Sequence, residues 1–157
     1  MKILAALFAV VLLAATAQAG SVAPREGWEV HDTRLGYQEL LQRLKKAVAD
    51  EGMNVVTEAG PTEAAKARGV TIPGNRVIGV YRADFAVRAV KASTAAMIEA
   101  PIRFYVTENE DGTATLSYKR PSFVFAPYVD EGGEALRTVA AELDVIFAAI
   151  ATRATAP

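Results

Sequence analysis

The sequence predicts an α+β domain, in which a small, mainly antiparallel sheet with a β-hairpin is backed by amphipathic helices. Segments with strand and helix patterns follow in the order strand–helix–strand–helix–strand–helix–hairpin–helix. A hairpin near the end and few crossover connections favour this class over a doubly wound parallel sheet. The last segment, from Leu136 to Ile150, repeats apolar residues at helical spacing through more than three turns, as expected of a helix that packs on a sheet.

The first nineteen residues are predicted to be a signal peptide and not part of the fold. Lys2 gives the positive start, Ile3–Ala15 is the apolar core, and Ala17–Ala19 is an A-x-A cleavage signal. The apolar run is too short for a membrane span. Cleavage after Ala19 would leave residues 20–157 as one domain, in the periplasm or secreted, with no stable membrane insertion.

Charge and cysteine content exclude several classes of function. The formal net charge is −1, and a near-neutral domain with no basic excess is not expected to bind nucleic acid. The chain has no cysteine, which removes thiolate nucleophiles, thiolate metal sites, redox pairs and lipoprotein acylation. His31 is the one histidine, so neither a metal site nor a cofactor is predicted.

The first half of the domain predicts two strands and two helices. Trp28–Arg34 alternates weakly and is expected to be a strand. Tyr37–Glu51 has apolar residues at helical spacing and predicts an amphipathic helix. Met53–Thr57 predicts a short apolar strand, and Glu63–Arg68 a short alanine-rich helix.

The next stretch predicts an interior strand and a third helix. Val77–Tyr81 is apolar on both faces, which is typical of a strand with neighbours on both sides, and Gly79 indicates close approach by another element. Asp84 is the expected N-cap of the third helix. Residues 122–133 are expected to be irregular, and residues 152–157 to be frayed.

Turn chemistry and side-chain pattern select one register for the hairpin. A two-residue Asp111-Gly112 turn would pair apolar Val106 with polar Ser117. A three-residue loop that ends at Gly112 instead pairs Val106 with Leu116, and places Gly112 at the left-handed position of a bulged loop. We therefore expect the second register. Its core face consists of Ile102, Phe104, Val106, Leu116 and Tyr118.

The opposite face of the hairpin is a candidate binding surface. In this register Arg103 lies across from Lys119, and like charges so placed repel by about a few tenths of a kcal/mol. A small anionic ligand, a second copy of the chain in a homodimer, or a carboxylate such as Glu99 or Glu58 would relieve the repulsion. The alternative is a solvated face with both side chains in water. The candidate ligand-binding residues are Arg82, Arg103, Tyr105, Lys119 and Arg120.

No motif predicts catalysis. A Ser-His-Asp set would need His31, but no Gly-x-Ser-x-Gly elbow is present. Acidic pairs such as Asp130-Glu131 fall in turn-rich segments, where acids usually face water. Gly132-Gly133 is better explained as a flexible helix entry than as a phosphate site. No catalytic residue is assigned, and the sequence favours a protein that is not an enzyme.

The order of several short motifs resembles the Domain of Unknown Function 302 family. The resemblance spans Trp28–Thr152 and rests on these pieces: Gly52, Ala65-x-x-x-Gly69, Val77–Tyr81, Ala100-Pro101, Asp111-Gly112 and Tyr118-x-x-Pro121. It implies a small α+β domain with an antiparallel sheet backed by helices, and dimerisation, but no reaction or cofactor. Members often carry Asp-His where this chain has Gly60-Pro61, and Gly-Asn-Pro where it has Arg82-Ala83-Asp84, which argues against activities that use those groups.

Three functional hypotheses follow from the sequence. The favoured one is a non-enzymatic binding or interaction module. The alternatives are an enzyme of unidentified reaction class and an envelope stress or structural accessory protein. A ligand-induced thermal shift would favour the first, whereas turnover would favour the second.

We expect the mature chain to begin at Gly20, because the A-x-A signal ends at Ala19. Intact mass spectrometry of the protein recovered from the periplasm or the medium should show the mass of residues 20–157. Recovery of the full-length chain from the membrane fraction would instead show that residues 1–19 act as an anchor.

Overall fold

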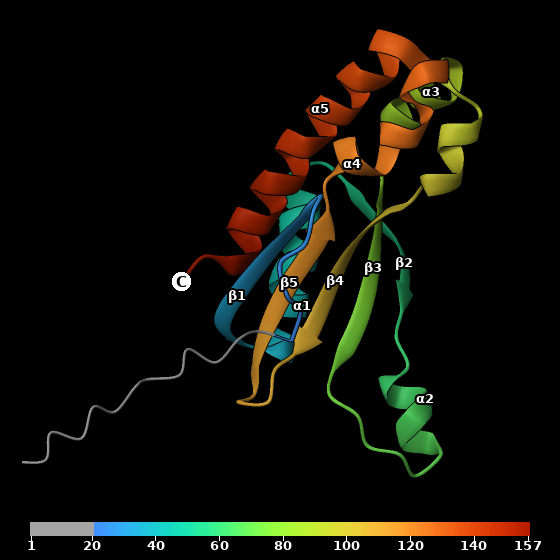
Figure 1. Ribbon diagram of the computed structural model, residues 1–157. Helices are drawn as coiled ribbons and strands as arrows, with labels where there is room; N and C mark the ends of the chain where they lie inside the picture. Colours follow the sequence, from blue (N-terminus) through green and yellow to red (C-terminus); the bar gives the residue numbers. More distant parts are fainter. Residues whose placement is uncertain (1–20) are drawn as a thin grey trace, which may run out of the picture.

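The computed structural model describes residues 21–157, so the predicted signal peptide lies outside the described residues. The strands form one five-stranded sheet in the order β1-β5-β4-β3-β2, with every neighbouring pair antiparallel. This sheet with its helices confirms the predicted α+β class (Figure 1). The strands are β1 (Trp28–Gly36), β2 (Asn54–Ala59), β3 (Asn75–Tyr81), β4 (Ile102–Glu108) and β5 (Thr113–Lys119).

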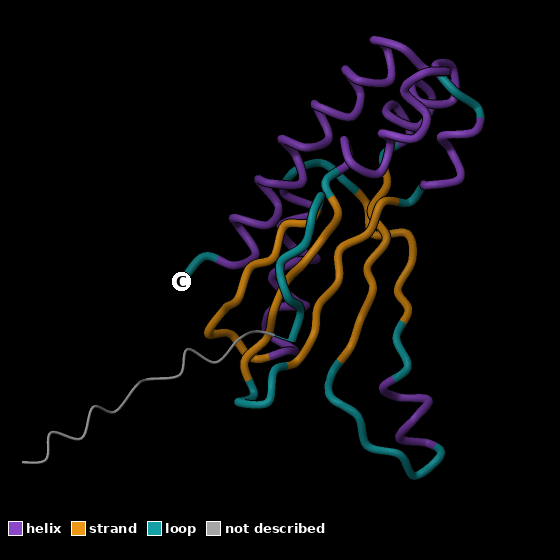
Figure 2. The backbone as a smooth tube through the Cα atoms, in the orientation of Figure 1, coloured by secondary structure: helices purple, strands orange, loops and turns teal. Residues whose placement is uncertain are grey.

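The helices cover one face of the sheet or extend beyond its ends. Helices α1 and α5 pack on each other behind the sheet, α3 and α4 gather at its upper end, and α2 lies below β2 (Figures 1 and 2). The face toward the viewer in Figure 1 is termed the open face. The helices are α1 (Tyr37–Asp50), α2 (Thr62–Ala67), α3 (Ala83–Ala92), α4 (Pro121–Phe125) and α5 (Val129–Thr155), with short 3-10 turns η1 (Ala95–Glu99) and η2 (Ala126–Tyr128).

The core lies between the sheet and helices α1 and α5, and an aromatic cluster forms its centre. The rings of Phe104 and Phe147 stack with centroids 4.7 Å apart, and Tyr118 contacts both at 5.0 and 5.8 Å. Phe104 and Phe147 are fully buried. Leu143 is also buried, which confirms the predicted core face of the last helix. The cluster therefore fixes α5 against β4 and β5.

The hairpin has the predicted register. Val106 pairs with Leu116 and Phe104 with Tyr118, and Gly112 has φ +81° in the loop between the strands. Residues with a side chain rarely adopt that angle, so glycine is needed for this turn. The register directs Ile102, Phe104, Val106, Leu116 and Tyr118 into the core, as predicted.

Strand β3 is interior, as predicted, because it pairs with β2 on one side and β4 on the other. The expected close approach at Gly79 is present. A Cβ added at Gly79 would lie 2.1 Å from Oγ1 of Thr57 and 2.7 Å from Cγ of Pro101. Both distances are shorter than any real contact, so only glycine fits between β2 and the segment that leads into β4.

The prediction that residues 122–133 are irregular is wrong. Pro121 begins α4, η2 follows, and α5 already starts at Val129. Proline is well tolerated in a first helical turn, where its missing N–H would have no partner. The backbone breaks at Gly133, with φ 55° and ψ −148°, so the helical turns before it are too short to show a periodic pattern.

The prediction of a frayed end at residues 152–157 is also wrong. Helix α5 continues to Thr155, and Ala151 and Ala154 are fully buried. Arg153 forms an ion pair with Glu51 after α1, and Arg43 donates to the carbonyl of Ala156. Small side chains allow close packing on α1 but give little hydrophobic periodicity, so the sequence pattern fades before the helix ends.

The third helix begins before the predicted N-cap. It starts at Ala83, with Arg82 in the capping position, and Asp84 lies in its first turn. The Asp84 carboxylate accepts hydrogen bonds from the Arg82 guanidinium and makes no side-chain cap. The Asp84 carboxylate therefore binds the guanidinium of Arg82 and not the backbone N–H groups at the start of the helix.

Within residues 21–157, no helix has both the length and the apolar character needed to cross a bilayer.

We expect Phe147→Ala to lower the free energy of unfolding by about 3–5 kcal/mol, because it empties the centre of the aromatic cluster. Val145→Ala on the same helix is the matched control. Val145 is 71% exposed, and its loss should change stability by less than about 0.5 kcal/mol. Urea unfolding measures both values. Equal losses in the two variants would show that the buried face of α5 is assigned wrongly.

Candidate functional site

The open face carries side chains in rows that run across the strands. One row contains Trp28 of β1, Lys119 of β5, Arg103 of β4 and Gly79 of β3. The next row contains Val30, Ser117, Tyr105 and Val77. Because successive side chains of a strand point to opposite faces, the residues that fill the core on one side fix these rows on the other.

A groove of about 420 Å³ lies on this face. Its size is near the lower end of the range for small-molecule sites, roughly 300–1,000 Å³. The lining combines aromatic and aliphatic side chains with three charged ones. The lining residues are Trp28, Asn75, Val77, Glu99, Ile102, Arg103, Tyr105, Tyr118, Lys119 and Val124.

Two cations stand side by side in the groove, as the hairpin register predicted. Extension of the Phe104–Tyr118 register by one residue places Arg103 across from Lys119, and both side chains are exposed. Within residues 21–157, neither side chain belongs to an ion pair. An anion in this part of the groove would therefore meet two cations with no carboxylate bound to them.

Trp28 forms an aromatic wall beside these cations. The ammonium of Lys119 lies 5.7 Å from the centroid of the Trp28 ring, and the guanidinium of Arg25 lies 5.0 Å from it. Both distances are within the range of cation–π attraction. The indole thus holds Lys119 near the groove and offers a flat apolar surface to a ligand.

One carboxylate and one amide complete the polar lining. Glu99, at the end of η1, accepts a hydrogen bond from the hydroxyl of Tyr128 at 2.8 Å. This hydrogen bond, followed by burial, raises the pKa of Tyr128, so the phenol remains a donor. Asn75 donates to the hydroxyl of Tyr105 at 2.5 Å. Both contacts orient side chains that face the groove.

The segment from Ser21 to Gly27, termed the strap, limits the groove on one side. It runs in front of the sheet in Figure 1 and is held at both ends. Ser21 hydrogen-bonds to Asn109 and Thr107 below, and the carbonyl of Gly27 accepts from the backbone of Arg120 above. Thr107, Thr115 and Ser117, polar residues of the open face, are buried. The strap thus leaves Arg103 and Tyr105 of β4 and Val77 of β3 in the groove lining.

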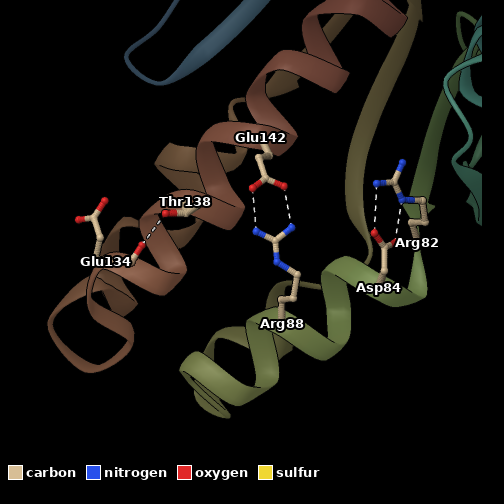
Figure 3. Close-up of polar contacts among 6 residues, drawn as sticks. All are labelled: Arg82, Asp84, Arg88, Glu134, Thr138 and Glu142. Carbon is tan, nitrogen blue, oxygen red and sulfur yellow. Dashed lines mark hydrogen bonds and ion pairs between the residues drawn. The ribbon is translucent and has the colours of Figure 1, made fainter.

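The sequence also placed Arg82 and Arg120 at this surface, but neither lines the groove. Arg82 lies at the start of α3, where it binds Asp84 and rests over the ring of Phe85 at 4.3 Å. Figure 3 shows that pair beside the paired contact between Arg88 and Glu142 that links α3 to α5. Arg120 lies 3.8 Å from Glu29.

The two carboxylates considered in the sequence have different positions. Glu99 lines the same groove as Arg103 and Lys119, which is the position that a carboxylate near these cations requires. Glu58 lies elsewhere on the sheet, 2.7 Å from Lys45 and 4.0 Å from Arg76, so it serves other cations.

His31 lies outside the groove lining. It pairs with Leu116 in the register of β1 and β5, and its ring stacks on Tyr118 with centroids 6.2 Å apart. Residues 21–157 contain no group of three or more His, Asp or Glu side chains that could hold a metal ion. The groove chemistry is therefore that of cations, aromatic rings, one amide and one carboxylate.

Sequence reasoning did not assign Trp28 and Asn75 to the site. The pairing of β1 with β5 joins segments about 90 residues apart, and no local pattern reveals its register. Asn75 was missed because β3 begins two residues before the apolar run that predicted it. The one indication in the sequence was that Asn75 lies two residues before Val77, so both would share a face if the strand extended that far.

Comparison with known proteins identifies the family. The family described as domain of unknown function DUF302 matches residues 29–150. The chain belongs to this family. A crystal structure of an uncharacterized conserved DUF302 protein from Bacillus stearothermophilus has the same fold, with a TM-score of 0.72 and 21% sequence identity. The match covers 83% of this chain and 99% of that one. No curated protein matches the chain.

Membership confirms the resemblance seen in the sequence, and with it the fold. The DUF302 relative shares too little sequence for any residue of the groove to be transferred from it. The shared fold does not by itself determine the chemistry of the groove.

The stability of the DUF302 chain should fall in alkali through Tyr118. Burial, with smaller effects of Glu29 and Asp144, raises the pKa of Tyr118 to about 12. The unfolded chain loses this proton near pH ~10, whereas the folded chain keeps it until about 12. The contribution of Tyr118 to the free energy of unfolding, roughly 2–3 kcal/mol, is thus complete below pH ~10 and is lost as the pH rises from there to about 12.

Denaturant unfolding at several pH values, compared with Tyr118→Phe, measures this loss. Phenylalanine keeps the ring but cannot ionise. Plots of the free energy of unfolding against pH should therefore differ in slope between the two proteins only from pH ~10 to about 12. Parallel curves throughout would show that the Tyr118 hydroxyl ionises equally in both states.

Proposed function

We propose that this protein is an exported binding module, in the periplasm or secreted, that holds the carboxylate of a small organic ligand in the groove of the open face. The predicted signal peptide supports the location. The groove supports the binding role, because a concave site of mixed apolar and polar lining is the usual form of a small-molecule site.

The adjacent cations Arg103 and Lys119 carry this proposal. Elsewhere on the molecule Arg76, Arg82 and Arg88 have carboxylate partners. Arg103 and Lys119 have no such partner among the described residues, although the strand register holds them next to each other. A bound carboxylate would replace their mutual repulsion with two charge-assisted hydrogen bonds, which are stronger than neutral ones.

The lining favours binding over turnover. The side-chain hydrogen bonds that its residues make within the described chain are Asn75 to Tyr105 and Tyr128 to Glu99. The first contains no base. In the second the raised pKa of Tyr128 keeps the phenol protonated, so the Glu99 carboxylate does not activate it as a nucleophile. The indole of Trp28 and the side chains of Val77 and Val124 give an apolar surface for the body of the ligand.

We expect 3-phenylpropionate, a small anion with an apolar body, to bind and to raise the melting temperature in a saturable way. Lys119→Met and Arg103→Gln should each weaken binding roughly tenfold, because each removes one charged hydrogen-bond donor. Added salt should weaken binding to the native chain as well. Calorimetric titration measures the affinities.

Lys91→Met is the matched control, since Lys91 is an exposed lysine of α3 outside the groove lining. Its affinity should equal that of the native chain. Equal affinity in the Lys119 and Arg103 variants would contradict the proposal. A change of Lys119→Met from dimer to monomer in light scattering, with no ligand effect, would show that the face binds a second copy instead.

A further inference from the structure

The groove carries charges of both signs, held by different parts of the fold. Arg103 and Lys119 project from the paired strands β4 and β5. Glu99 comes from η1, the turn that connects α3 to β4, and Tyr128 of η2 holds its carboxylate at 2.8 Å. The carboxylate of Glu99 is therefore held by a contact that neither cation makes.

These opposite charges do not neutralise one another. Ion pairs are present at ten places in the described chain, but none joins Glu99 to Arg103 or Lys119. The partner of Glu99 is a neutral phenol, so its negative charge is not cancelled. The groove therefore presents charges of both signs to its ligand, which gives specificity for a ligand with complementary charges.

A simple anion would satisfy only part of this lining. Its carboxylate would meet Arg103 and Lys119, but its body would lie near the Glu99 carboxylate and gain nothing from it. A ligand that also carries an ammonium would bind both sides and would leave no charge of the groove without a partner. Its apolar part would rest against Trp28, Val77 and Val124.

We infer that the ligand is a small zwitterion with an apolar body, such as an apolar amino acid or a dipeptide. This rests on the proposed function, because it concerns the same groove. The carboxylate binds Arg103 and Lys119, and the ammonium donates to Glu99. The volume of about 420 Å³ fits a ligand of this size and leaves no room for a long peptide enclosed in the groove.

The first test compares four probes on the native chain: L-phenylalanine, the dipeptide L-alanyl-L-phenylalanine, 3-phenylpropionate and 2-phenylethylamine. We expect one of the two zwitterions to bind about tenfold more tightly than 3-phenylpropionate, since it adds one charged hydrogen bond. The amino acid and the dipeptide differ in the distance between their ammonium and carboxylate groups. The one that binds more tightly shows which distance matches the charges of the groove. The amine, which lacks the carboxylate, should bind most weakly.

The second test removes the negative side of the groove. Glu99→Gln should abolish the advantage of the zwitterion and leave 3-phenylpropionate binding equally well or better. Glu110→Gln, in the hairpin loop and outside the groove lining, is the matched control and should leave every affinity unchanged. The melting temperature of each variant without ligand shows whether it is folded.

The outcomes separate the two proposals. Binding of 3-phenylpropionate with an affinity equal to that of both zwitterions would overturn the inference and leave the proposed function intact. No binding of any probe at millimolar concentration would overturn both. The probe series needs no variant, so it decides the matter even if Glu99→Gln does not fold.

Discussion

The pairing of β4 with β5 is the constraint on which the rest of this molecule depends. The three-residue loop closes with Gly112 at φ +81°, and this fixes the register along both strands. A shift by one residue would turn the side chains of one strand over relative to the other. Either Phe104 or Leu116 would then leave the core, and Arg103 and Lys119 would no longer share a face. One turn therefore decides both the stability of the fold and the location of the groove.

The two faces are used differently because all the helical packing falls on one of them. Helices α1 and α5 cover the face that carries Ile78, Val106 and Leu116, and bury these three side chains completely. On the opposite face the strap reaches across the sheet, with Ser21 bound to Thr107 at one end. An antiparallel sheet can leave one face to solvent, and here the part over β3 and β4 forms the groove.

The groove gathers residues from elements that are distant in the chain. Trp28 comes from the first strand, Glu99 from η1, and Lys119 from the last strand, and each is positioned by a different packing contact. The Glu99 carboxylate is placed by Tyr128, which follows the hairpin, and not by its neighbours in sequence. The negative side of the groove thus depends on η2, and the positive side on the hairpin.

The sequence by itself determined the α+β class, the hairpin register and the faces of its strands, because period-two alternation and turn chemistry are local properties. It therefore placed Arg103, Tyr105 and Lys119 together on one surface. Only the tertiary structure decided which other residues join them. Arg82 and Arg120 bind Asp84 and Glu29 away from the groove, whereas Trp28 and Glu99 enter it. Strand order, the β1–β5 register and the path of η1 fix these positions, and such long-range contacts leave no periodic signal in the chain. The helical turns of residues 121–132 and the end of α5 were missed for a related reason, since packing on neighbouring helices stabilises segments whose own patterns are weak.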